Sequence, residues 1–165
     1  MGCHNSQSVN IALQYLARAP QAAQLILALE KSDTEYTIEL NSNGDDSTSL
    51  GNTVHWDPSQ GKACGTPSKP DRIKVGADQS PAMSLLHELI HVSHNPLSRI
   101  YHTLQATNDD YDNVEEERTI ELESQIAKTL GEGIRRDHRG RHVPVPTVLT
   151  KPKCPCATQK QMGAR

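Results

Sequence analysis

Residues 87–91 read His-Glu-Leu-Ile-His, and these residue types at this spacing suit metal-dependent hydrolysis. Positions four apart lie on one face of an α-helix, so His87 and His91 would present two imidazole nitrogens to one metal ion. Glu88 is badly placed to be a third ligand but would reach a water on the metal and take its proton as general base. The pattern predicts the zinc site of a peptidase.

The residues around this pattern favour the helix that it requires. Ser80 and Pro81 suit a helix start, as a capping serine followed by proline at the first helical position. Apolar residues fill the helix, and Asn95 with Pro96 ends it. The alternative is an amphipathic core helix with surface histidines. It is disfavoured, because two histidines and a glutamate on a largely apolar helix would be buried without a partner.

A catalytic zinc site needs a third protein ligand. The metzincin pattern would place a histidine six residues after His91, where this sequence has Leu97. His94 shares the helix but lies a turn too far along to join the same tetrahedron, so we expect it at the rim or at the helix C-cap. The third ligand is therefore expected downstream, among the acidic residues.

A second helix, expected over residues 114–130 and ended by Gly131, begins with three glutamates. Its apolar stripe, followed backwards in steps of three and four, ends at Glu115. A buried carboxylate needs a cation, so we expect Glu115 to be the third ligand. Glu116 is expected to support a ligand histidine, and Glu117 to lie on a solvated face. The alternative is that all three are solvated acids favoured by the helix dipole.

The rest of the chain predicts one α+β domain with a small twisted sheet. Helices are expected at 9–19 and 21–31, on either side of Pro20, and strands at 36–40, 53–56 and 72–75. Residues 41–52 and 57–71 look like turns and loops, and 101–113 is polar and acidic. The predicted organisation is an N-terminal segment (1–19), a metallopeptidase domain (20–142) and a disordered tail (143–165).

Composition narrows the class of protein. A net charge of −3 argues against a nucleic-acid partner, and no apolar run is long enough to span a membrane. There is no apolar stretch typical of a secretory signal near the N-terminus. Cys3, Cys64, Cys154 and Cys156 do not form a disulfide framework, and the Cys154–Cys156 spacing is wrong for a zinc knuckle. We expect free thiols and a reducing compartment.

Residues 87–91 together with Glu-Glu-Glu-Arg-Thr at 115–119 resemble the zinc site of clostridial neurotoxin light chains. The chain also resembles the much shorter NleD/HopH-type type III effector metallopeptidases, best between Thr53 and Arg141. This resemblance implies a zincin-like fold, with Arg118 close to the site. Either Arg135 or Arg141 would supply a cation to the transition state. The neurotoxins' downstream Arg/Tyr pair does not carry over whole, because no tyrosine follows Tyr111.

The resemblance implies a zinc endopeptidase that acts inside a host cell as a secreted bacterial effector. Its substrates would be host signalling proteins, among them mitogen-activated protein kinases, and the protein is expected to be a monomer. Two alternatives stay open: a catalytically inactive zincin fold used as a binding module, and a peptidase toxin of bacterial competition. An intact Glu88 argues against the binding module.

The first six residues match the N-myristoylation pattern, with Gly2 as the acceptor and Ser6 completing the motif. Cys3 would carry a second acyl chain, and two chains anchor a protein stably where one alone is marginal. The alternative is an ordinary start of the chain. If the motif is used, the protein would associate with host membrane through this end.

Overall fold

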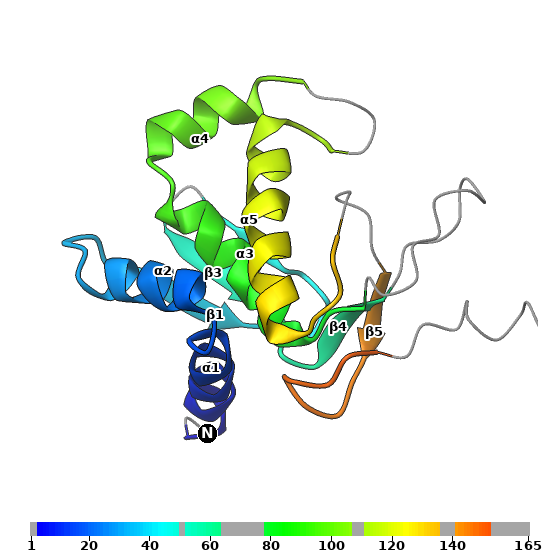
Figure 1. Cartoon of the computed structure of the whole chain (residues 1–165). Coiled ribbons are helices and arrows are strands. Elements are labelled where there is room, and N and C mark those ends of the chain that lie inside the picture. Colours follow the sequence, from blue (N-terminus) through cyan, green and yellow to red (C-terminus); the bar gives the residue numbers. More distant parts are fainter. Residues whose placement is uncertain (1–2, 50–51, 64–77, 107–110, 136–140, 153–165) are drawn as a thin grey trace, which may run out of the picture.

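The computed structural model describes residues 3–49, 52–63, 78–106, 111–135 and 141–152 (Figure 1). The predicted α+β class is confirmed. The helices are α1 (Cys3–Leu16), α2 (Pro20–Glu30), α3 (Pro81–Ser93), α4 (Pro96–Thr103) and α5 (Val114–Leu130). The strands are β1 (Thr37–Leu40), β2 (Ser47–Thr48), β3 (Thr53–Trp56), β4 (Gln60–Ala63) and β5 (Arg141–Pro144).

Two small sheets flank the helix that carries residues 87–91. In the first sheet β3 is central, parallel to β1 on one side and antiparallel to the short β2 on the other. In the second sheet β4 and β5 pair antiparallel. Backbone hydrogen bonds in both directions between Lys62 and Gln79 join β4 to the segment that leads into α3. The second sheet therefore fixes the entry to this helix.

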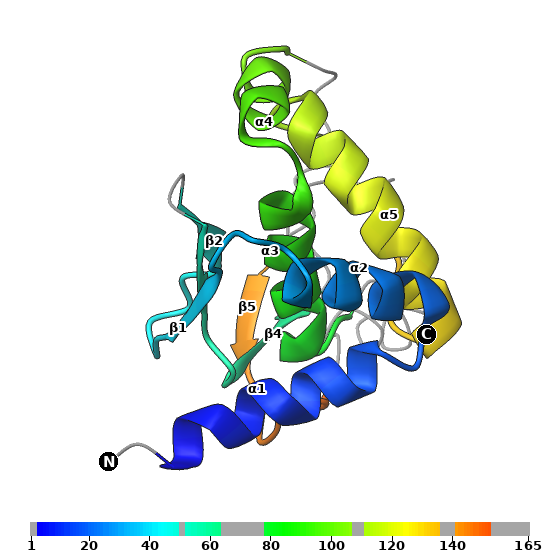
Figure 2. The same cartoon turned by 90° about the vertical axis from the view of Figure 1, so that its left-hand side faces the viewer.

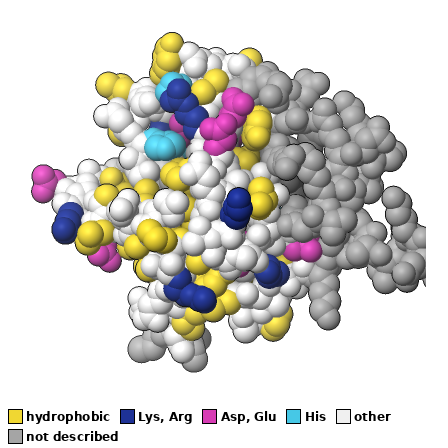
Figure 3. Space-filling model, in the orientation of Figure 1, with side chains coloured by type: hydrophobic (Ala, Val, Ile, Leu, Met, Phe, Trp, Pro, Cys, Tyr) yellow, Lys and Arg dark blue, Asp and Glu magenta, His cyan; other side chains and the backbone are white. Residues whose placement is uncertain are grey.

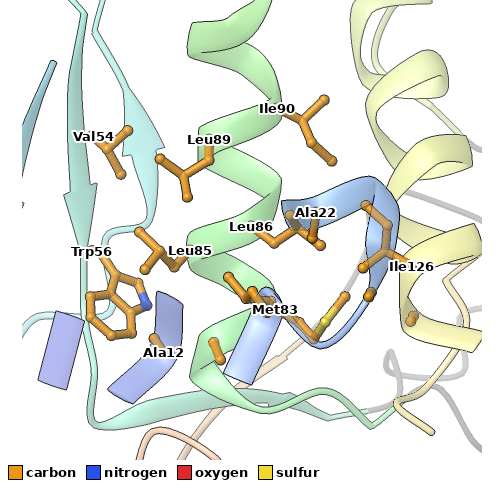
Figure 4. Packing of buried hydrophobic residues seen from close by; sticks show 14 of the residues in the cluster. Ala12, Ala22, Val54, Trp56, Met83, Leu85, Leu86, Leu89, Ile90 and Ile126 are labelled. Atoms are coloured by element: carbon orange, nitrogen blue, oxygen red, sulfur yellow. The ribbon is translucent and has the colours of Figure 1, made fainter. Parts of the chain in front are cut away.

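Helix α3 lies at the centre of the molecule, between the first sheet and α5, with α1 and α2 packed on it (Figure 2). Its residues from Pro81 to Val92 are all buried, which is why the sequence is so rich in apolar residues there. Leu85 and Leu89 point toward β3, on the side of Trp56, whereas Leu86 and Ile90 point toward the opposite side, where Ala22 and Ile126 lie (Figure 4). Close packing on every side holds the helix in one position.

The N-terminus of α3 is fixed by residues from distant parts of the chain. Pro81 occupies the first turn and Ser80 the N-cap position, as predicted. The Ser80 side chain does not cap the helix, however. Its hydroxyl and its backbone N–H donate to the Glu132 carboxylate, at 2.8 and 3.1 Å. The Tyr15 hydroxyl of α1 donates to the same carboxylate at 2.7 Å.

Residues 3–19 and 141–152 both belong to the fold, which corrects the predicted organisation. Ala12 and Leu16 of α1 are fully buried in the core, so residues 3–19 are not a separate segment. Residues 141–152 are not a tail either, since β5 pairs with β4 and Val148 is only 7% exposed. The Val148 carbonyl accepts a hydrogen bond from the Ala82 N–H at 3.0 Å. Residues 153–165 lie outside the described residues.

Several short elements depart from the expected ones. Helix α1 starts earlier than residue 9, β2 lies within the expected turn at 41–52, and β4 lies within the expected loop at 57–71. Helix α4 was not predicted at all. Asn95 ends α3 but also begins α4, because its side chain accepts the backbone N–H of Leu97 at 3.0 Å. The strand expected at 72–75 lies outside the described residues.

Candidate metal centre

His87 and His91 share one buried face of α3, as predicted. They are 1% and 6% exposed, and their Nε2 atoms are 3.2 Å apart. Two ligand nitrogens of one tetrahedral zinc ion, each bonded at about 2.0–2.1 Å, would be about 3.3 Å apart. The spacing of four residues has therefore brought two imidazoles to the separation that a shared metal ion requires.

Glu116 of α5 completes a group of three donors. Its two carboxylate oxygens lie 3.2 Å from Nε2 of His87 and 3.3 Å from Nε2 of His91. These distances again match the edge of a tetrahedron around one metal ion. His87, His91 and Glu116 form a group that could hold a metal ion, and the chemistry of this donor set, two imidazoles and a carboxylate, suits zinc.

Glu115 is buried, as its position at the end of the apolar stripe predicted, but it faces a different atom. Its Oε1 lies 3.1 Å from Nδ1 of His91 and 2.6 Å from Nδ1 of His94. It therefore contacts the side of the His91 ring that faces away from His87. The geometry favours the reverse of the expected roles, with Glu116 among the ligand atoms and Glu115 supporting a ligand histidine.

Glu123, about two helical turns further along α5 than Glu115, supports the other histidine and was missed from the sequence. Its Oε2 lies 2.7 Å from Nδ1 of His87, and the residue is completely buried. Gln79 donates to the other oxygen of Glu123 and, at 2.9 Å, to the Gly133 carbonyl. Steps of four residues from Glu115 pass through Thr119 to Glu123, so the helical period contained this signal.

Each ligand histidine is thus held at Nδ1 by a carboxylate, which leaves Nε2 directed at the common point. A carboxylate on the outer nitrogen fixes the ring and makes the inner nitrogen a stronger donor to a metal. His94, expected at the rim or at the C-cap, is the C-cap residue of α3 and holds Glu115 in place. The site is built to orient both imidazoles.

The acidic side chains around His87 and His91 favour a positive charge at the site. Burial opposes protonation of His91, but the hydrogen bonds that its ring donates to Glu115 and Glu116 outweigh burial and raise the pKa of His91 to about 9. Burial likewise opposes ionisation of Glu115, yet His91 and His94 lower the pKa of its carboxyl to about 2. The pKa of Glu116 is also lowered, against burial, by His87 and His91. A divalent cation would take the place of the proton on His91.

Glu88 lies beside the donor group without belonging to it. Its side chain is directed toward β2, where the Thr48 hydroxyl donates to Oε2 at 2.7 Å and lies 3.2 Å from the Glu88 carbonyl. The residue is 5% exposed, so its carboxylate is largely shielded from solvent. A carboxylate that is held in one position and shielded from water is suited to moving a proton.

The three arginines expected near the site lie in different places. Arg118 is exposed, and its Nη1 lies 2.6 Å from Nε2 of His102 on α4, so it is directed away from the metal-ligand atoms. Arg141 is exposed at the start of β5. Arg135 is 5% exposed and donates from Nη1 to the Glu123 oxygen that contacts His87, at 3.2 Å. Arg135 therefore supports the site indirectly, because it binds the carboxylate that contacts Nδ1 of His87.

Lys62 is a charged residue of this neighbourhood that the sequence did not single out. Burial lowers the pKa of its ammonium group, the charge of Arg135 lowers it further, and Glu123, Glu88 and Asp46 oppose this shift. Lys62 thus belongs to the charged surroundings of the site, on the strand that adjoins the entry to α3.

Most of the residues expected to carry acyl chains or free thiols lie outside the described part of the chain. Gly2, Cys64, Cys154 and Cys156 lie outside the described residues, and Cys3 is the first residue of α1. Among the described helices, none is long and apolar enough to cross a bilayer.

Comparison with known proteins gave no match to a family model, to a curated protein or to a solved structure.

Proposed function

We propose that this protein is a zinc-dependent endopeptidase. The observation that carries the proposal is a group of three donors at tetrahedral spacing, together with a buried carboxylate, Glu88, that follows His87 in α3, acts on His91 through its charge and is not one of the three. A metal site with a purely structural role does not require an additional buried carboxylate such as Glu88, which Thr48 holds in place. The resemblance to type III effector metallopeptidases and neurotoxin light chains supports the same function.

In this proposal His87, His91 and Glu116 hold the zinc ion. Zinc, when bound, would acidify a water molecule and polarise the carbonyl of the scissile peptide bond. Glu88 accepts the proton of the attacking water and later gives it to the leaving amine, so that the proton is returned as the peptide bond breaks. The Thr48 hydroxyl holds the Glu88 carboxylate in one orientation, and Glu115 and Glu123 fix the two imidazoles.

The proposed substrate is a protein of a eukaryotic host cell, which the enzyme would reach as a secreted effector. Mitogen-activated protein kinases are the substrates that the resemblance suggests. The proposed location is the host cytoplasm or, with acylation at Gly2 and Cys3, the inner surface of a host membrane.

The experiment is a search for new protein termini in a eukaryotic cell extract incubated with the zinc-loaded protein. Glu88→Gln should keep zinc and the fold but lower the rate of cleavage by roughly a hundredfold to ten-thousandfold. Glu121→Gln, on the exposed side of α5, is the matched control and should cleave normally. Equal sets of termini with and without the Glu88 carboxylate would contradict the proposal. A zinc-loaded protein without cleavage would favour the binding-module alternative.

A further inference from the structure

A cavity of about 290 Å³ lies between α1, α2, the first sheet and α3, and neither ligand histidine lines it. Leu89 of α3 points into the space toward Val54 of β3 (Figure 4). We call this space the α2–β1 cavity. Its apolar lining comes from elements far apart in the sequence and includes Leu13, Ile26, Leu29, Ile38, Val54 and Leu89.

The α2–β1 cavity has an apolar interior and a polar entrance. Val54 and Leu89 are 0% and 4% exposed, so they form its closed end. The lining residues of the other end, where α2 leads into β1, are polar and exposed: Glu30, Ser32, Thr34 and Thr37. The cavity therefore opens to solvent at this link, and a ligand would enter past hydroxyl and carboxylate groups.

The size of the α2–β1 cavity suits a small aliphatic molecule. A dry apolar cavity of roughly 150 Å³ holds one benzene molecule, so about 290 Å³ leaves room for about a dozen carbon atoms. Polar groups line one end only. A matching ligand thus has an aliphatic part, which supplies the affinity, and one polar end, which fixes its orientation.

The charges at the entrance select that polar end. Glu30 is the last residue of α2, where the helix dipole adds partial negative charge to that of its carboxylate. The link to β1 adds two exposed acids, Asp33 and Glu35, against one base, Lys31, which does not line the cavity. Figure 3 shows acidic side chains beside hydrophobic ones in this region, at its left. A cationic group is favoured at the entrance, and a carboxylate is disfavoured.

We propose that the α2–β1 cavity is a binding site for a primary amine that carries a single aliphatic chain of about ten to twelve carbons. The chain would lie against Val54 and Leu89, with the protonated amine at the Glu30 carboxylate. The hydroxyls at the entrance would accept further hydrogen bonds from the ammonium group. This site is separate from the metal centre, and its occupation does not depend on the proposed peptidase function.

The first test compares three probes with the same chain: dodecylamine, dodecanol and dodecanoate. Their Kd values for the full chain are measured by titration calorimetry at neutral pH, below the concentrations at which they form micelles. Dodecylamine should bind at least about tenfold more tightly than dodecanoate, with dodecanol between them. Glu30→Gln should remove most of the preference for the amine over the alcohol. Glu121→Gln, exposed on α5, is the matched control and should keep that preference.

The second test locates the bound probe. Leu29→Trp places a larger side chain in the cavity and should weaken dodecylamine binding at least about tenfold, with circular dichroism as a test of folding. Leu27→Trp, on the exposed side of the same helix, should bind like the unsubstituted chain. In the unsubstituted chain, dodecylamine should shift the methyl NMR signals of Ile26 and Ile38, but not those of Ile126 in the core.

The contrary outcomes are distinct. Equal Kd values for the amine and the carboxylate would refute the selection by charge. Equal weakening by Leu27→Trp and Leu29→Trp, or unshifted signals of Ile26 and Ile38, would place the probe elsewhere and refute the site. Absence of binding by all three probes would do the same. None of these measurements uses cleavage, so a failure of the peptidase proposal would leave their result unchanged.

Discussion

Glu123 on α5 holds His87 on α3, with its Oε2 2.7 Å from the Nδ1 atom of the ring. The same helix supplies Glu115 to His91 and Glu116 to the space between the two rings. Residues 115, 116 and 123 therefore reach the site from one straight element packed against α3. The proposed metal centre is a contact between two helices, which makes it sensitive to single substitutions on either of them.

Glu123→Gln should weaken zinc binding by roughly ten- to a hundredfold, the usual effect of removing a residue that orients a ligand histidine. The amide would not accept charge-assisted hydrogen bonds from both His87 and Arg135. Zinc affinity measured by competition with a chromophoric chelator checks this, with circular dichroism as a test of folding. Glu121→Gln, exposed on the same helix, should bind zinc like the unsubstituted protein. Unchanged affinity in Glu123→Gln would refute the supporting role.

Glu116→Ala should lose tightly bound zinc, because it removes one of the three donors. Glu115→Ala should have the smaller effect expected of a supporting residue, and Glu117→Ala should have none. Metal content after dialysis, measured for the three variants side by side, distinguishes them. Retention of zinc in Glu116→Ala together with its loss in Glu115→Ala would restore the assignment expected from the sequence.

The stabilising effect of zinc should increase with pH. In the metal-free protein the raised pKa of His91, about 9, contributes stability that is complete below about pH 6.5 and is lost as the pH rises toward 9. Zinc binding needs the neutral imidazole, so the metal must displace this proton. The rise in Tm on adding zinc should therefore be larger at about pH 8 than at about pH 6. A smaller rise at the higher pH would contradict this reasoning.

Acidification should destabilise the metal-free protein through a second group of the site. The pKa of Glu115 is lowered from 4.5 to about 2, so its contribution is present above about pH 4.5 and is lost as the pH falls toward 2. Glu115→Gln should reduce this loss, which urea unfolding across the acidic range would measure. Glu117→Gln is the matched control from the same turn of α5. An identical acid profile for Glu115→Gln and the unsubstituted protein would contradict the assignment.

Membrane attachment in eukaryotic cells should depend on the N-terminus. A fluorescent protein fused to the C-terminus should move from membrane to cytosol on Gly2→Ala, because N-myristoyl transfer requires this glycine. Cys3→Ser should weaken retention partway, since one acyl chain alone binds a bilayer marginally. Ser8→Ala, beyond the motif, is the control. A wholly cytosolic fusion of the unsubstituted chain would end the acylation hypothesis.

The sequence was sufficient for the elements with a strong period and clear end signals. The helix of His87 and His91 and the helix ended by Gly131 were predicted nearly to their bounds, and the strand at 53–56 to the residue. It was insufficient to choose between Glu115 and Glu116. Adjacent residues differ by about 100° around a helix axis, and both directions can face a neighbouring helix. Which carboxylate reaches Nε2 depends on how α5 crosses α3, which no local pattern records.

The missed elements depend on distant partners. β2 has two residues and exists because β3 lies beside it, and β5 exists because β4 does. Helix α4 was missed for a different reason, since its apolar residues face solvent and the usual rule for a packed helix does not apply. Arg118 was expected near the site from the family resemblance, whereas its side chain contacts His102 of α4.

The support of α3 by residues that come long before and long after it in the sequence, Tyr15 and Val148, limits when the site can form during synthesis. His87 and His91 leave the ribosome well before Glu116 and Glu123, and Val148, which accepts the Ala82 N–H, follows last. A growing chain therefore carries the two histidines without the carboxylates that orient them. A metal ion that binds early would have two protein ligands only, and the complete centre requires the later synthesis of α5, which carries the third donor.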